Sequence, residues 1–318
     1  MGNDEMKATN ELLIQNVKES KSINEHKRAI HCLLQLENGD YASCSDDRRI
    51  NIYSEKDFKL KQKINEHENS VTYIFKMKNN QILSSSEDET IKIIKLTDNN
   101  TKYTLIDKIT DNHDFIVQSI EISNGNIVSI TSKRTLKFYQ LNKDKKYECF
   151  KQFDKSGIDF LYELPNKNLI SASYVEKNIK FWNIENYSIT QMMNKISIIK
   201  SMELMCMLTE NLLGIAAEKF YVIDIVNKKL IKKIQINKAH IYCVIKLNNN
   251  TLLFGIEGEF SLQGNNFHFN QYKLHEKGDN LQLISVKEKV HNTQINYMIQ
   301  GKNGEIISCS EQRIKIWK

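Results

Sequence analysis

The sequence predicts an all-β protein, because one short apolar segment recurs along the whole chain inside the same order of strand-like stretches. The segment has two apolar residues, then Ser or Gly in six of its seven copies, then two small or apolar residues. The copies are Tyr41–Ser45, Ile82–Ser86, Ile127–Thr131, Leu169–Ser173, Leu212–Ala216, Leu252–Ile256 and Ile306–Ser310. Seven units of about 44 residues account for almost all of the 318 residues, and this period is typical of a seven-bladed β-propeller.

Each unit, or blade, predicts four short antiparallel strands, which we letter a to d. Apolar and polar residues alternate in strand a, as in Val71–Met77, and a turn such as Asn38-Gly39 leads to the recurring segment. That segment is strand b, and its nearly continuous apolar character indicates burial on both faces. Strand c has an aliphatic-x-aliphatic-aromatic pattern, as in Ile50–Tyr53, and the more polar strand d follows, as in Lys59–Ile64. Helical periodicity of useful length is absent.

Composition and charge exclude several classes of protein. The net charge is +6 in a chain with 45 Lys and Arg and 39 Asp and Glu, which is too mixed to indicate nucleic-acid binding. The six cysteines include no C-x-x-C pair, so we expect reduced thiols in a cytoplasmic protein rather than a zinc site or disulfide framework. The sequence contains no membrane-spanning run and no signal-peptide apolar region.

Blades 1 and 2 carry a pattern of polar residues at matching positions. His26, Ser43, Asp47 and Tyr53 of blade 1 correspond to His67, Ser84, Asp88 and Ile94 of blade 2. This pattern resembles the WD40 repeat, in which the His, Ser, Asp and strand-c aromatic form a buried hydrogen-bonded tetrad. The resemblance covers the chain from about residue 26 to the end and implies a WD40-type propeller. The implied tetrad residues are His26, Ser43, Asp47 and Tyr53, then His67, Ser84 and Asp88, and finally His291, Ser308 and Trp317.

The remaining blades depart from the repeat. Blade 7 has a shorter turn without the Asp. In blade 3, His113 lies within one residue of the expected register, and Ser132-Lys133 replaces the turn Asp. Blades 4 to 6 depart further, and blade 5 is the weakest, with Gly214 in place of Ser.

The chain is predicted to be a single domain that closes on itself. Blade 7 ends at Trp317-Lys318, directly after its strand c. The stretch Glu11–Lys18 precedes blade 1 much as Lys61–Ile64 precedes blade 2, so we expect residues 10–22 to supply the closing strand of blade 7. Residues 10–318 then form the propeller and residues 1–9 a polar tail. Such closure removes free strand edges.

We expect no catalytic residue, cofactor or metal. The repeated His/Ser/Asp sets superficially resemble a hydrolase triad, but an enzyme needs one site rather than one in each of several blades. His240, His268 and His275 lack metal-ligand spacing, and the chain has no G-x-G-x-x-G, G-x-x-x-x-G-K or G-x-S-x-G motif. Phosphoinositide-binding propellers carry Phe-Arg-Arg-Gly, whereas Arg48-Arg49 here lacks the aromatic and the glycine.

Loop residues supply a candidate partner-binding rim. In the WD40 family, the b–c loops and the loops entering each blade lie on the same face, which implies a basic patch on blade 1 beside an acidic patch on blade 2. Two interpretations stay open: ordinary solvated turn residues, or a rim that binds a peptide with both signs of charge. Its aromatics are either interface anchors or core residues of strand a. The rim residues are Lys27, Arg28, Arg48, Arg49, Tyr73, Glu87, Glu89, Phe115, Tyr242 and Arg313.

Two extensions in blade 6, Glu257–Asn266 and His275–Asn280, are either decorated loops or binding elements.

The predicted function is a non-catalytic scaffold or adaptor. We expect a monomeric propeller that binds protein partners within a larger complex, without nucleic acid or membrane insertion. Within this class, a substrate receptor of a ubiquitin ligase and a subunit of a ciliary or trafficking complex stay open. The alternative is a propeller enzyme or small-ligand binder that uses the central channel. The polar strand-a positions His31, Thr72, Gln118 and Asp159 form no reactive set.

Overall fold

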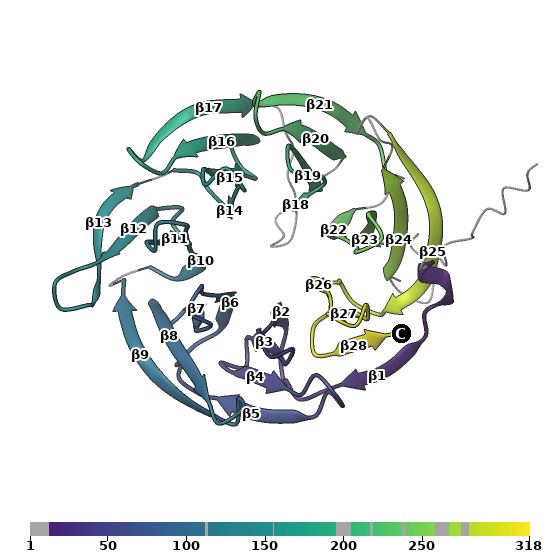
Figure 1. Cartoon of the computed structure of the whole chain (residues 1–318), viewed down its shortest axis with the longest axis horizontal. Coiled ribbons are helices and arrows are strands. Elements are labelled where there is room, and N and C mark those ends of the chain that lie inside the picture. Colours follow the sequence, from purple (N-terminus) through teal and green to yellow (C-terminus); the bar gives the residue numbers. More distant parts are fainter. Residues whose placement is uncertain are drawn as a thin grey trace, which may run out of the picture.

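Seven four-stranded sheets surround a central axis in the computed structural model, which confirms the predicted all-β propeller (Figure 1). The structure describes residues 13–111, 114–154, 156–194, 205–216, 219–236, 240–257, 267–274 and 280–318. No helix of these segments is long and apolar enough to cross a bilayer.

The strands keep the same order in every blade. Blades 1 and 2 consist of β2 (Ile30–Gln35), β3 (Tyr41–Ser45), β4 (Ile50–Tyr53), β5 (Leu60–Ile64), β6 (Val71–Lys76), β7 (Ile82–Ser86), β8 (Thr90–Thr97) and β9 (Lys102–Thr110). Blades 3 and 4 consist of β10 (Ile116–Glu121), β11 (Ile127–Thr131), β12 (Leu136–Leu141), β13 (Tyr147–Phe153), β14 (Phe160–Glu163), β15 (Leu169–Ser173), β16 (Asn178–Asn183) and β17 (Ser188–Asn194). Blades 5 and 6 consist of β18 (Met205–Met207), β19 (Leu212–Ala216), β20 (Phe220–Asp224), β21 (Lys229–Ile234), β22 (Ile241–Lys246), β23 (Thr251–Glu257), β24 (Phe267–Leu274) and β25 (Leu281–His291). Blade 7 contains β26 (Tyr297–Gln300), β27 (Ile306–Cys309), β28 (Ile314–Trp317) and, from the N-terminal region, β1 (Glu19–Ile23).

Burial follows the position of each strand within its blade. Figure 1 shows strand a of each blade beside the central axis and strand d at the perimeter. Strand b is buried along its whole length in blades 1 to 4, because adjacent blades cover both of its faces. The recurring apolar segments are therefore the centre of the core.

The N-terminal region closes the ring. β1 pairs antiparallel with β28, and the backbones of Lys18 and Lys318 exchange hydrogen bonds of 2.7 and 2.9 Å. The strand is shorter than the predicted residues 10–22, because Ile14–Asn16 forms a 3-10 helix. Ile14 is buried against blade 6, where its N–H donates to Gln271 Oε1 at 2.8 Å. The apolar character of this stretch thus serves packing rather than strand pairing.

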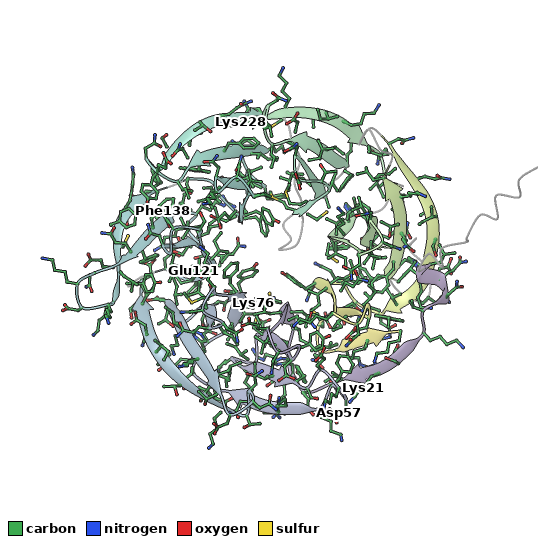
Figure 2. The ribbon with its side chains drawn as sticks, in the orientation of Figure 1. Lys21, Asp57, Lys76, Glu121, Phe138 and Lys228 are labelled. Carbon is green, nitrogen blue, oxygen red and sulfur yellow. The ribbon has the colours of Figure 1, made fainter. Side chains whose placement is uncertain are left out.

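The antiparallel order gives the disc two distinct faces. The b–c turns and the connections from one blade to the next lie on what we call the upper face, and the a–b and c–d turns lie on the lower face. Neighbouring blades are tied together along strand a: Thr72 Oγ1 donates to the carbonyl of Ile116 at 2.7 Å, and Glu121 accepts from the Lys78 N–H at 2.7 Å. Figure 2 shows Glu121 and Lys76 on the inner strands, whereas Lys21 and Asp57 lie at the perimeter.

Candidate functional site

The blade 1 tetrad residues lie within hydrogen-bonding distance of one another. His26 Nε2 is 2.7 Å from Ser43 Oγ, and His26 Nδ1 is 3.0 Å from both carboxylate oxygens of Asp47. Ser43 Oγ lies 3.4 Å from Tyr53 Oη. Asp47 also accepts the backbone N–H groups of Lys27 and Arg49, so the network joins the loop entering the blade to its b–c turn. Burial raises the pKa of Tyr53 to about 12.

Blade 2 repeats this geometry without the aromatic. His67 Nε2 lies 2.7 Å from Ser84 Oγ, and His67 Nδ1 lies 2.8 Å from Asp88. Burial alone would raise the pKa of Asp88, but the hydrogen bond and charge of His67 hold it well below its usual range. Burial lowers the pKa of His67 despite the adjacent carboxylate. The buried Lys92 places its Nζ 3.9 Å from Asp88, which adds a cation to this centre.

Blade 7 keeps the histidine without a carboxylate. His291 Nε2 lies 2.7 Å from Ser308 Oγ, and Trp317 Nε1 donates to the same oxygen at 3.0 Å. The pKa of His291 is lowered to about 3, mainly by burial and further by the charges of Lys315 and Arg313. Because the turn Asp is missing, nothing in this network stabilises the protonated imidazole.

Two further serine–aromatic pairs were not singled out from the sequence. In blade 3, Ser129 Oγ lies 3.3 Å from Tyr139 Oη, and in blade 4, Trp182 Nε1 donates to Ser171 Oγ at 2.8 Å. The signal was present, since each serine is the third residue of the recurring segment and each aromatic ends strand c. Blades 1, 3, 4 and 7 therefore share a buried hydroxyl paired with an aromatic polar atom.

These networks fit a structural role better than catalysis. Ser43, Ser84 and Ser308 are fully buried, so no substrate could reach their hydroxyls. The described residues include no group of three His, Cys, Asp or Glu able to hold a metal ion. A satisfied buried network instead fixes the blade's turn and avoids the cost of burying an unpaired polar group.

The strand-a positions considered for a channel site are engaged in contacts within the fold. His31 Nε2 lies 2.5 Å from Asp46, which also accepts a hydrogen bond from Ser70. The side-chain amide of Gln118 donates to the Leu161 carbonyl at 3.2 Å, while its oxygen accepts the Leu161 N–H at 2.8 Å. These polar groups join neighbouring blades rather than converge on one point.

The charged rim residues lie on the upper face. Lys27 and Arg28 are exposed in the connection that enters blade 1, and Arg48 and Arg49 form its b–c turn. Glu87 and Glu89 occupy the corresponding turn of blade 2 and are half-buried. Within the described segments, the four blade 1 cations make no ion pair, although acidic residues lie on the next blade. Arg313 is exposed in the b–c turn of blade 7.

The aromatic rim residues have different environments. Phe115 is 45% exposed on the upper edge of blade 3. Tyr242 is half-buried, with its hydroxyl 3.1 Å from Glu257. Tyr73 is only 9% exposed and belongs to a core cluster, so it is a core residue of strand a rather than a surface anchor. Val71 and Tyr73, two residues apart in β6, are both buried, as the alternation of a strand gives.

Exposed apolar residues on blade 4 were missed in the sequence. Tyr174 and Val175, in the b–c turn, are 47% and 54% exposed. Their turn adjoins that of blade 3, because Asp159 accepts from Arg134 Nε at 3.2 Å and from the Tyr174 N–H at 2.7 Å. Turn residues are usually polar, and no periodicity distinguishes an exposed aromatic there. The sequence candidates His113 and most of the two blade 6 extensions lie outside the described residues.

Comparison with known proteins identifies two repeats. The family model described as "WD domain, G-beta repeat" matches residues 17–54 and 58–95. These segments contain the two blades in which His, Ser and Asp all come together. No curated protein matches the chain.

Proposed function

Because this chain is a WD40-repeat β-propeller, we propose that it is a non-catalytic cytoplasmic scaffold that binds protein partners within a multiprotein complex. WD40 propellers generally act as protein-interaction scaffolds, and the rigid disc offers two faces and a perimeter to several partners at once. A substrate receptor of a ubiquitin ligase and a subunit of a ciliary or trafficking complex both use such a disc. The channel alternative is less well supported, because the polar strand-a side chains are engaged between blades.

The observation that carries this proposal is the charged upper rim. Lys27, Arg28, Arg48 and Arg49 on blade 1 lie next to the acidic edge of blade 2. In the described chain, these cations make no ion pair with that edge. Charges arranged in this way steer and orient a partner of complementary charge, and Arg is enriched at interface hot spots. We assign the rim to a partner segment that carries both signs of charge.

The test is capture of partners from the native cell. The double variant Arg28→Glu, Arg48→Glu should lose proteins that the wild type retains in an affinity purification, measured by quantitative mass spectrometry. The matched control is Lys56→Glu, Lys143→Glu, which reverses two exposed lysines in c–d turns on the lower face. If the Arg28 and Arg48 variant retains the same proteins as wild type, the rim is not the partner site.

A further inference from the structure

A second surface on the upper face combines exposed apolar side chains with a local charge opposite to that of the whole molecule. Phe115, Tyr174 and Val175 are 45%, 47% and 54% exposed and lie on neighbouring blades 3 and 4. We call these three residues the apolar patch. Single exposed apolar residues are ordinary, but several exposed apolar residues on neighbouring blades of one face are typical of binding surfaces.

Hydrogen bonds connect the loops that carry the patch residues. The Phe115 carbonyl accepts the Ser132 N–H at 2.8 Å, which ties Phe115 to the b–c turn of blade 3. Arg134 in that turn binds Asp159, and Asp159 in turn accepts the Tyr174 N–H. The side chains therefore project from turns that are held together across the boundary between β10–β13 and β14–β17, which are neighbours in Figure 1.

The charge around the patch is acidic. The described residues of the upper-face connections and b–c turns of blades 2 to 4 are 65–70, 87–89, 111, 114–115, 132–135, 154, 156–159 and 174–177. They contain ten Asp and Glu and three Lys and Arg. Lys92, Lys137 and Lys180 of the c strands add three ammonium groups, which lie beside Asp88, Asp111 and Glu176 of these loops, so the formal charge is −4 in a chain whose net charge is +6. On the blade 2 side, Glu68 is exposed, Glu87 is half-buried, and neither makes an ion pair within the described residues.

We propose that the apolar patch docks an extended basic segment of a partner protein, with an apolar side chain on Phe115 and Tyr174 and with Lys or Arg beside Glu68 and Glu87. This inference deepens the proposed scaffold function and rests on it. Charge complementarity selects the occupant, since an acidic segment would meet a surface of its own sign. The apolar contact supplies affinity that salt does not screen, whereas exposed charge pairs weaken with salt.

The experiment uses three fluorescent 12-residue peptides and measures their binding by anisotropy at about 150 mM salt, where the screening length is about 8 Å. The basic probe contains Lys, Arg, Gly and Ser around a central Leu. In the second probe Ser replaces the Leu, and in the third Glu replaces every Lys and Arg. We expect the basic Leu probe to bind tightest and the acidic probe not to bind.

Variants separate the two contributions. Phe115→Ala and Tyr174→Ala should each weaken the basic Leu probe about tenfold and leave the Ser probe unchanged, since they remove only apolar contact. Glu68→Lys, Glu87→Lys should weaken both basic probes. Leu141→Ala is the control, because Leu141 is 53% exposed at the end of β12 that leads into a lower-face turn. Thermal unfolding verifies that each variant is folded.

The outcomes also distinguish this inference from the scaffold proposal. Tighter binding of the acidic probe, or unchanged binding of the basic Leu probe to both alanine variants, would overturn the basic-segment assignment. So would failure of the wild type to bind any probe. Arg28→Glu, Arg48→Glu should not weaken the basic probes, because these residues lie on blade 1. Partner capture that depends on Arg28 and Arg48 would then still support the scaffold.

Discussion

At the scale of single residues, the three histidine networks differ in whether a carboxylate lies beside the imidazole. His26 and His67 each face a carboxylate, whereas His291 faces the Ser308 hydroxyl and feels the charges of Lys315 and Arg313. Blade 7 lacks the turn carboxylate, so only burial and neighbouring cations act on its imidazole, and they lower the pKa of His291 to about 3. The sequence predicts this departure, because the turn residue is visible, but the size of its effect depends on the burial of the imidazole.

His291 should make the stability of the protein depend on pH. Its folded-state pKa, lowered to about 3, lies below the ordinary value near 6.5, so the unfolded chain binds the proton more tightly. Its contribution is fully present above pH 6.5 and is lost progressively as pH falls toward 3. Between pH 7.5 and 5.5 the free energy of unfolding should fall by about 1 kcal/mol more for wild type than for His291→Gln.

Urea unfolding at the two pH values measures this difference. The His291→Gln variant lacks the titrating imidazole, and its own loss of stability at fixed pH cancels when each protein is compared with itself. Equal pH dependence in both proteins would show that the imidazole is accessible to protons in the folded state.

At the scale of strands, some deviations from the repeat are compensated by packing. In β19, Gly214 stands where five of the other six blades have Ser, and a Cβ built at this position would lie 2.4 Å from the Phe220 ring and 2.9 Å from Leu208. Phe220 is fully buried and packs edge-on against Phe254 with ring centroids 5.1 Å apart. Blade 5 therefore replaces the buried hydroxyl with an aromatic ring, and the glycine makes room for it.

Restoring the repeat residue in blade 5 should destabilise the protein. Gly214→Ser places a Cβ and a hydroxyl against the Phe220 ring, which should cost about 1–3 kcal/mol in free energy of unfolding. Adding Phe220→Leu should recover part of the loss, because the smaller side chain relieves the clash. Urea unfolding at neutral pH gives both values, and an unchanged midpoint for Gly214→Ser would contradict the compensation.

The sequence predicts the strands much better than it predicts surface orientation. In six of the seven blades, the first residue of the recurring segment is also the first residue of strand b. This agreement is possible because a strand that is buried on both faces leaves a continuous apolar run in the sequence. Of the two interpretations of the rim aromatics, the core one holds for Tyr73, which is buried like Val71 two residues before it. Phe115 and Tyr174 lie in loops, and loop residues have no periodic pattern in the sequence that would show which of them are exposed.

At the scale of the whole molecule, the ring depends on one junction between distant parts of the chain. β1 completes the sheet of β26, β27 and β28, so the N-terminal and C-terminal regions share blade 7. Ile23 is 7% exposed and packs in a cluster that includes Ile314 and Ile316 of blade 7 and Tyr53 of blade 1. The closing strand thus contacts both its own blade, including the C-terminal strand β28, and the neighbouring blade 1.

A charge placed inside this junction should open the ring. Ile23→Lys buries an ammonium group in the cluster and should lower the free energy of unfolding by about 2–4 kcal/mol, since a buried unpaired charge is among the most destabilising substitutions. Ser22→Lys is the matched control, because Ser22 is the exposed neighbour in the same strand.

An opened junction frees the edge of β28, so Ile23→Lys should also elute as larger species in size-exclusion chromatography. Deleting residues 1–9, the predicted tail, should change neither measurement. If Ile23→Lys and Ser22→Lys unfold at the same urea concentration and elute alike, the ring is held by the contacts between strands a, such as those of Thr72 and Gln118, rather than by its closing strand.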